Sequence, residues 1–201
     1  MKRFYFRVQF ICFLGLLSVL SCSEQASAQP SFYKQLAQSA VTLTADEVTY
    51  DPSYFTISYP NGDVPAHKGV CTDVIIRAYR KMGIDLQRLV HEDMRKRFNE
   101  YPKKWGLKGP DKNIDHRRVP NLMCFFDRYG EQKTLAAQAS AYLPGDIVCW
   151  NLGNGLLHIG LISDVASADG KRYQVVHNIG SGQVLEDCLF QYTIIGHYRY
   201  K

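Results

Sequence analysis

The sequence changes character at Tyr142, and this change constrains the fold more than any other feature. Before it, apolar residues recur at helical spacing; after it, short runs of β-branched and aromatic residues predominate. We expect strands at residues 147–152, 158–165, 173–179, 184–190 and 194–200. Asn154-Gly155 and Asp169-Gly170 are turn signals between the first three strands. Helices followed by an antiparallel sheet of about five strands predict an α+β fold.

Three helices are expected ahead of the sheet, at residues 71–82, 85–98 and 119–130. In the first, apolar residues at 74, 75, 78, 79 and 82 form one buried face, and a glycine follows. The third begins with a proline in its first turn. A further helical pattern begins around Phe32, whereas residues 49–59 indicate an extended arm.

The first 28 residues have the features of an export signal. Three basic residues precede an apolar run at residues 8–20, which is too short for a membrane-spanning helix. Two cleavage sites remain open. Residues 26–28 (Ala-Ser-Ala) suit release of a soluble protein, whereas residues 19–22 resemble a bacterial lipobox that would lipidate Cys22. Both predict an exported protein in the periplasm, and the second adds a lipid anchor in the outer membrane as its sole membrane attachment.

Charge and cysteine spacing exclude several classes of partner. The formal net charge of +5 falls to +3 without residues 1–28, and no basic stripe is present, so we expect no nucleic-acid partner. The cysteines include no C-x-x-C pair, which excludes a zinc ribbon, and we expect no metal or cofactor. A disulfide among Cys124, Cys149 and Cys188 stays open because an exported protein meets an oxidising compartment.

Cys71 is the first candidate catalytic residue. A loop-like stretch precedes it and a helical pattern follows it, so its sulfur should lie at a helix N-terminus. Unpaired backbone N–H groups and the positive end of the helix dipole favour an anion there. We therefore expect the pKa of this thiol to fall below its usual value of about 8.5. The alternative is a buried, inert structural cysteine.

Two histidines in the expected sheet complete a candidate site. His158 opens one strand and His177 lies near the end of the next. A strict two-residue turn would set position 158 opposite 181, whereas a longer loop at 166–170 sets it opposite 178, beside His177. We favour the longer loop because the small residues before the turn form a poor strand. A cysteine facing such a pair has the groups that a thiol hydrolase needs, a base and a residue that orients the base.

Four blocks of the sequence resemble the NlpC-type cell-wall peptidases. They are Gly-Val-Cys-Thr-Asp at 69–73, Leu-Pro-Gly-Asp-Ile-Val at 143–148, His-Ile-Gly at 158–160 and Val-His at 176–177. The resemblance implies a papain-like fold, with N-terminal helices packed on a C-terminal antiparallel sheet, and a Cys-His-polar triad. The chain departs from the pattern in the residues that flank its cysteine and in the 72 residues between Cys71 and Pro144.

A second resemblance covers more of the chain. Residues 50–200 are similar to an exported bacterial family, domain-of-unknown-function family 1287. Asp-His-Arg-Arg-Val-Pro-Asn at 115–121 and Gly-His-Tyr-Arg-Tyr at 196–200 carry this likeness. It implies no particular substrate.

The first resemblance implies a role for each site residue. Cys71 would be the nucleophile, His158 the general base and later acid, and His177 the orienting residue, with Asn178 as the alternative for that third role. Tyr59, twelve residues before the cysteine, is the candidate for stabilising an oxyanion, and its alternative is simple packing.

Substrate-binding candidates are Asp73, Trp105, His116 and Arg117. The segment at 115–118 has dense hydrogen-bonding capacity just before a helix. It would either hold a substrate carboxylate or brace the loop.

These observations predict an exported cysteine hydrolase that cleaves an amide bond in peptidoglycan stem peptides. Residues 29–48 would form a tether with an N-terminal helix, and residues 49–201 a papain-like catalytic domain. Two alternatives stay open. One is a non-catalytic module on the same fold that binds the cell wall or a partner; the other is a thiol acyltransferase or amidase acting on a lipid or a protein.

Overall fold

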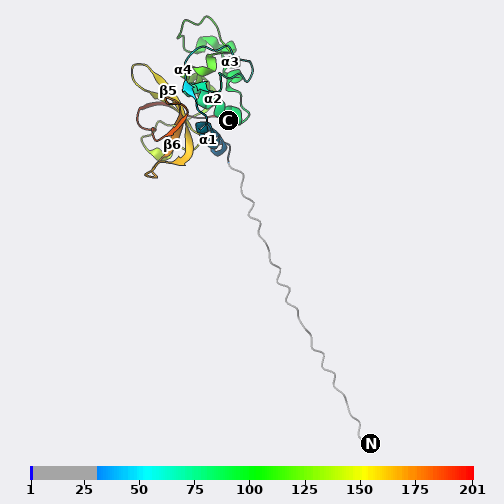
Figure 1. Ribbon diagram of the computed structural model, residues 1–201, viewed down its shortest axis with the longest axis vertical. Coiled ribbons are helices and arrows are strands. Elements are labelled where there is room, and N and C mark those ends of the chain that lie inside the picture. Colours follow the sequence, from blue (N-terminus) through cyan, green and yellow to red (C-terminus); the bar gives the residue numbers. More distant parts are fainter. Residues whose placement is uncertain (2–30) are drawn as a thin grey trace.

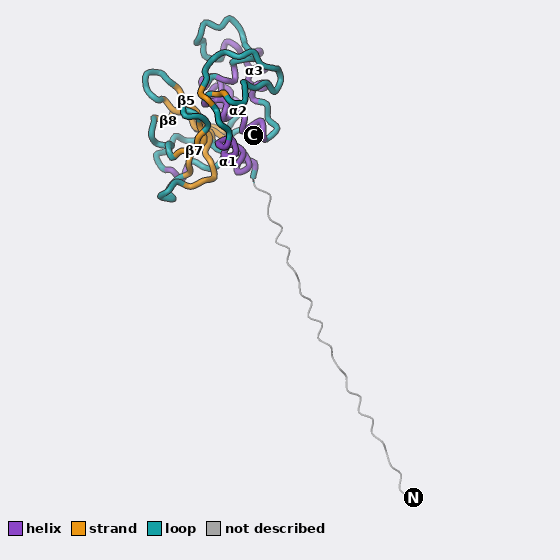
Figure 2. Tube along the Cα trace, viewed as in Figure 1, coloured by secondary structure: helices purple, strands orange, loops and turns teal. Residues whose placement is uncertain are grey.

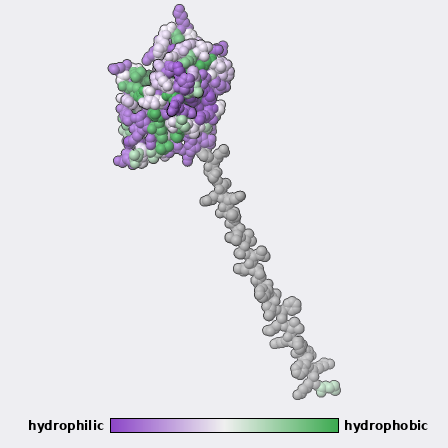
Figure 3. Space-filling model, viewed as in Figure 1, coloured by the Kyte–Doolittle hydropathy of each residue, from purple (hydrophilic) through white to green (hydrophobic). Residues whose placement is uncertain are grey.

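A computed structural model describes residue 1 and residues 31–201 of the chain, and Figure 1 shows its arrangement. The expected export signal, both cleavage motifs and Cys22 lie outside the described residues. Within residues 31–201, no helix is long and apolar enough to cross a membrane. The fold is α+β, as the sequence predicts: helices pack on an antiparallel sheet. The face of the described region seen in Figure 3 mixes hydrophilic and hydrophobic residues.

Four helices form where the described sequence shows helical patterns. They are α1 (Phe32–Thr42), α2 (Cys71–Lys81), α3 (Leu86–Arg97) and α4 (Val119–Tyr129). Polar side chains cap two of them: the side chain of Ser31 accepts a hydrogen bond from the Lys34 amide, and that of Asp85 accepts one from the Arg88 amide. Short 3₁₀ turns lie at Leu43–Ala45, Phe98–Glu100, Asp115–Arg117 and Ala139–Ala141.

The main sheet has six strands, all paired antiparallel, in the order β3-β8-β4-β5-β6-β7. Strands are orange in Figure 2, where β5, β7 and β8 are labelled. The strands are β3 (Glu131–Gln132), β4 (Ile147–Asn151), β5 (Leu157–Ala166), β6 (Tyr173–His177), β7 (Val184–Glu186) and β8 (Thr193–Arg199). Five of them coincide with the expected strands, although β7 ends earlier. The short edge strand β3 was not expected.

A second, two-stranded sheet lies beside the N-terminus of α2. β1 (Thr49–Tyr50) pairs in parallel with β2 (Lys68–Gly69), which sets Tyr50 opposite Gly69. Of the extended arm expected at 49–59, only these first two residues form a strand. Gly69 lies two residues before Cys71, so this pairing places Tyr50 close to the cysteine.

The main sheet buries a different core on each face, because successive residues of a strand point to opposite sides. On the side that we call the helix face, Ile159, Leu161 and Val176 pack in one core with residues of α1, α2 and α4. On the opposite side, the far face, Trp150 and Val175 pack with residues of the loops around it: Tyr142, Cys188 and Leu189.

A β-bulge sets the register between β5 and β6. Near the turn, Ala166 pairs with Tyr173, which is the register of a strict two-residue turn. The bulge between Ile162 and Ala166 then shifts the ladder, so that Leu161 pairs with Val176. Continued from that pair, position 158 falls opposite 179, one residue from the expected 178. The shift matters because it moves position 158 from opposite 181 to opposite 179, two residues closer to His177 on the same face of the sheet.

Candidate active site

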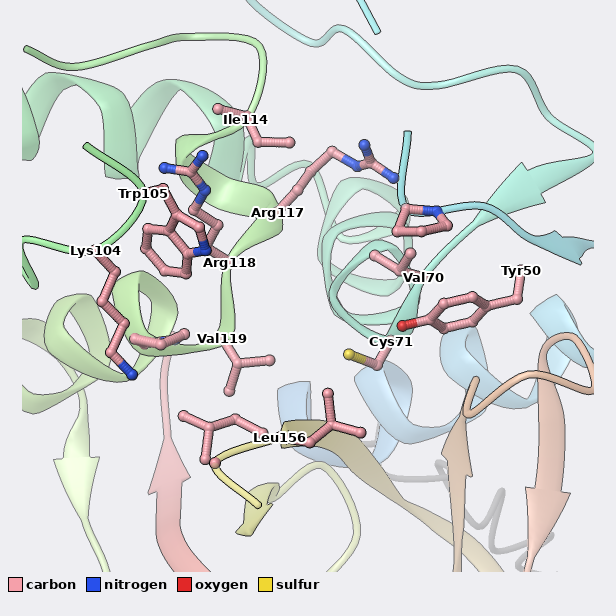
Figure 4. Close-up of a pocket in the computed structure, with 14 residues that line it drawn as sticks. Tyr50, Val70, Cys71, Lys104, Trp105, Ile114, Arg117, Arg118, Val119 and Leu156 are labelled. Carbon is pink, nitrogen blue, oxygen red and sulfur yellow. The ribbon is translucent and has the colours of Figure 1, made fainter. Parts of the chain in front are cut away.

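Cys71 is the first residue of α2 and lies in the wall of a cavity of about 480 Å³ (Figure 4). The preceding residue, Val70, is extended, so the chain turns into the helix at the cysteine. The cavity is lined by Tyr50, Pro52, Val70, Cys71, Lys104, Trp105, Ile114, Arg117, Arg118, Val119, Pro120, Gly155, Leu156 and Leu157. The expected position at a helix N-terminus is therefore confirmed.

The charge state of Cys71 differs from the expectation. Burial raises the pKa of the thiol to about 12, and the nearby negative charge of Asp73 acts in the same direction. Hydrogen bonds from the backbone amides of Ile159, Thr72 and Cys71 itself favour the thiolate, as a helix N-terminus should, but burial outweighs them. The expected lowered pKa is wrong because only 6% of the residue is exposed to solvent. The resting sulfur is a neutral thiol.

His158 and His177 are in contact on the far face of the sheet. Nε2 of His158 lies 2.9 Å from Nδ1 of His177, and Nε2 of His177 lies 3.0 Å from a carboxylate oxygen of Glu186. Burial, together with the neighbouring imidazole, lowers the pKa of His158 to about 3. Burial also lowers the pKa of His177, although Glu186 opposes this. Both imidazoles are thus neutral near pH 7. Glu186, which the sequence patterns did not single out, extends the pair to a chain of three.

The sulfur of Cys71 approaches this chain at the backbone of β5. The amide that hydrogen-bonds to the sulfur belongs to Ile159, the residue directly after His158. The His158 ring itself packs against Trp150 on the far face, with ring centroids 5.7 Å apart. Among residues 31–201, no hydrogen bond joins the sulfur to either imidazole. The structure therefore places the nucleophile candidate beside the strand of its base without a direct bond between the two side chains.

Asn178, the alternative third residue, lies on the cysteine side of this arrangement. It is fully buried, and its side-chain amide donates to the carbonyl of Gly69, two residues before Cys71, at 3.4 Å. Its side-chain oxygen accepts from the Gly180 amide. Asn178 thus connects the end of β6 to the segment that leads into α2.

Tyr50, rather than Tyr59, lies at the cavity beside Cys71. Tyr59 packs edge-on against His91, with ring centroids 5.3 Å apart, and is not among the residues that line the cavity. Tyr50 does line the cavity, and Figure 4 shows its hydroxyl directed toward the sulfur. Burial raises the pKa of Tyr50, and the charge of Cys71 adds to the effect. The extended pattern at 49–59 contained this residue, but only the β1–β2 pairing identifies it.

Asp73 and Arg117 form a buried ion pair at the back of the cavity. Nε and Nη2 of Arg117 each lie 2.9 Å from an oxygen of Asp73, and at most 2% of either side chain is exposed. The same carboxylate accepts a hydrogen bond from the Val70 amide at the start of α2. These two candidates for substrate binding are therefore satisfied by each other and hold the loop before Cys71.

Arg117 is paired with Asp73, so Arg118 is the positively charged side chain at 115–118 that is left to contact a ligand. Its guanidinium stacks over the ring of Trp105 at 4.1 Å, and both residues line the cavity. Its Nη1 atom is buried and has no hydrogen-bond partner in the described part of the chain. Lys104 lines the same cavity, whereas none of the fourteen described lining residues is acidic. The arrangement suits an anionic group.

His116 does not join this site. Only 1% of it is exposed, and it is not one of the residues that line the cavity. Burial and the positive charge of Arg117 lower its pKa to about 3.

The four cysteines at 71, 124, 149 and 188 are all free, so none of the disulfides left open by the sequence is present.

Comparison with known proteins identifies a family. The family described as "Domain of unknown function (DUF1287)" matches residues 37–200. The chain belongs to this family. A relative, the "Uncharacterized protein YijF" of Escherichia coli (strain K12), is 48% identical over 199 residues, which cover 93% of this chain and 97% of the relative. No solved structure matches the chain.

Proposed function

We propose that this DUF1287 protein is an exported cysteine hydrolase of papain-like architecture that cleaves an amide bond. The supporting observation is the position of Cys71: its sulfur begins α2, borders a cavity and receives a hydrogen bond from the residue that follows His158. His158 would act as the general base, and its ring is held by His177 and Glu186. No other thiol of the described residues combines a helix N-terminus with a cavity.

The neutral resting thiol requires proton transfer during attack. The sulfur and Nδ1 of His158 are not hydrogen-bonded in the resting structure, so substrate binding would have to bring them into contact; a C–S bond then forms to the substrate carbonyl while the thiol proton passes to Nδ1 of His158, and His158 protonates the leaving amine. Water hydrolyses the resulting thioester and regenerates the thiol. His158 can accept at Nδ1 only if its Nε2 carries hydrogen and donates to His177 Nδ1. His177 in turn donates from Nε2 to Glu186, so the chain of three selects the productive tautomer.

Two donors are positioned for the oxyanion. The backbone N–H of Cys71 lies in the first turn of α2 and faces its own sulfur, and the Tyr50 hydroxyl is directed toward the sulfur in Figure 4. A donor of this kind contributes about 3 kcal/mol to transition-state stabilisation in well-studied hydrolases. Tyr50 therefore replaces Tyr59 in the proposed mechanism.

The cavity supports a carboxylate-bearing peptide as the substrate. Arg118 presents a stacked guanidinium with an unpartnered Nη1, and Lys104 adds a second positive charge. Peptidoglycan stem peptides carry free carboxylates beside their amide bonds, and an exported protein would encounter them. We therefore propose a stem-peptide amide as the bond that is cleaved.

Defined stem peptides test this proposal. We expect the purified protein to cleave a peptide with a free carboxylate, with products identified by mass spectrometry, and Cys71→Ala to be inactive. Cys124→Ala, which removes a half-buried thiol in α4, is the matched control and should retain activity. Arg118→Met, or amidation of the substrate carboxylate, should raise KM about 10- to 100-fold, the effect of one charge-assisted hydrogen bond. Intact peptides after prolonged incubation under reducing conditions would contradict the proposal.

A binding module on the same fold is the second candidate function. The observation that favours it is the high pKa of Cys71 together with the lack of a hydrogen bond between its sulfur and an imidazole. This alternative predicts that stem peptides bind without being cleaved and that Cys71→Ala binds them as tightly as the wild type. Calorimetry with uncleaved peptides separates the two functions.

A further inference from the structure

We propose that His177, Glu186 and Cys188 form a binding site for a divalent cation of the Zn²⁺ type on the far face of the sheet. Each residue offers a different donor, an imidazole nitrogen, a carboxylate oxygen and a sulfur, and these atoms all lie within 4.8 Å of one another. The imidazole and the thiolate are preferred ligands of zinc and its neighbours in the transition series.

The donor separations fit a tetrahedral ion. Bonds of about 2.0–2.3 Å from zinc to nitrogen, oxygen and sulfur place neighbouring donors roughly 3.2–3.6 Å apart. Nε2 of His177 lies 3.0 Å from Glu186 and 3.5 Å from the sulfur of Cys188. Small shifts of the Glu186 carboxylate, whose side chain is 46% exposed, would complete the geometry. The same exposure gives an ion a path of entry and leaves a fourth position for water.

The surrounding residues hold the three donors in place. The second nitrogen of His177, Nδ1, already contacts Nε2 of His158, and such a partner fixes the orientation of a metal-bound histidine. Asp187, between the other two donors in sequence, forms two hydrogen bonds of 2.5 and 2.6 Å with the guanidinium of Arg172. Its carboxylate is thereby turned away, and the short segment from Glu186 to Cys188 is anchored.

Metal binding would also control the proposed catalytic base. A cation on Nε2 of His177 leaves hydrogen on Nδ1, which then donates to Nε2 of His158. The hydrogen of neutral His158 must then lie on Nδ1, so His158 cannot accept the proton of Cys71. The thiol proton of Cys188 is released to solvent as the metal–sulfur bond forms. Inhibition rests on the proposed function, whereas the binding itself does not.

Titration with Co²⁺ alone tests the site, because cobalt bound to a thiolate has a charge-transfer absorption band. We expect one Co²⁺ per chain with this band, displaced by added Zn²⁺. Cys188→Ala should lose the band, and Glu186→Gln should keep it while weakening binding at least tenfold. Cys71→Ala and Cys124→Ala are the controls, and both should behave like the wild type.

Two outcomes would overturn the proposal. One is the absence of a sulfur-to-cobalt band in the reduced wild-type protein. The other is a band that survives in Cys188→Ala but disappears in Cys71→Ala, which would place the metal on the helix face. Where peptide cleavage is measurable, Zn²⁺ should inhibit the wild type and not Cys188→Ala. Binding without any cleavage activity would leave this site supported and remove only the hydrolase proposal.

Discussion

Cys71 and Cys188 lie on opposite faces of the main sheet, and burial raises the pKa of each thiol to about 12. Cys188 lies 3.5 Å from an imidazole nitrogen of His177 but packs in a core with Trp150 and Leu189. Cys71 has no such contact, yet it borders the cavity and receives backbone amide hydrogen bonds. The two thiols thus differ in what surrounds them: Cys188 has a histidine neighbour but a closed apolar core, whereas Cys71 has a cavity and amide donors, and on these grounds we propose Cys71 as the nucleophile.

The largest expected effect separates the two thiols. Replacing Cys71 with alanine should lower kcat by about 10⁴-fold or more, because no other group can form the thioester. Cys188→Ala should keep kcat within tenfold of the wild type in metal-free buffer. Steady-state hydrolysis of a stem peptide measures both. Loss of turnover in Cys188→Ala with retention in Cys71→Ala would mean that Cys188, on the far face, is the nucleophile instead of Cys71.

The next effect concerns the ion pair that holds the helix-face site. Arg117→Met leaves the buried carboxylate of Asp73 without its partner and should cost about 3–5 kcal/mol in the free energy of unfolding. Arg118→Met, the matched change at the next residue, should cost less than about 1 kcal/mol because Nη1 of Arg118 has no partner to lose. Urea unfolding monitored by circular dichroism measures the difference. Equal costs would contradict the description of Arg117 as paired with Asp73 and of Arg118 as lacking such a partner.

The smallest expected effect is a pH dependence of the folding stability, which arises from His158 on the far face of the sheet. The pKa of His158 is about 3 in the folded protein and about 6.5 when unfolded, so the unfolded chain binds more protons between these values. Stability should therefore fall as the pH drops from 6.5 towards 3, with roughly 1–2 kcal/mol of the loss between pH 7 and 5 coming from this residue. His158→Gln should reduce that loss, measured as the change in urea midpoint. Exposed His67→Gln is the control and should leave the loss unchanged.

The elements of the fold follow from local patterns in the sequence. The helix after Cys71 ends near Gly83, which adopts the left-handed conformation with φ of 78°. Five strands coincide with runs of β-branched and aromatic residues. The bulge between Ile162 and Ala166 was not predictable, because such a local irregularity depends on packing across the sheet and leaves no turn signal. It brings position 158 two residues closer to His177 along the ladder.

The candidate site was predicted in part. The contact between His158 and His177 was expected from their blocks, whereas Glu186 and Cys188 reach them only through the pairing of β6 with β7 and the loop that follows. The pKa of Cys71 could not be inferred, because helix position indicates amide donors but not the depth of burial. Spacing along the chain pointed to Tyr59, but a pairing between distant strands places Tyr50 at the cavity.

Labelling with an electrophilic stem-peptide analogue, a peptidyl chloromethyl ketone, shows whether Cys71 is the nucleophile and His158 its base. Peptide mapping locates the labelled sulfur, and the rate of labelling reports proton transfer to the base. We expect a single adduct on Cys71 that forms at least tenfold more slowly in His158→Gln. An adduct on Cys188, or labelling of Cys71 at the same rate in His158→Gln, would contradict it.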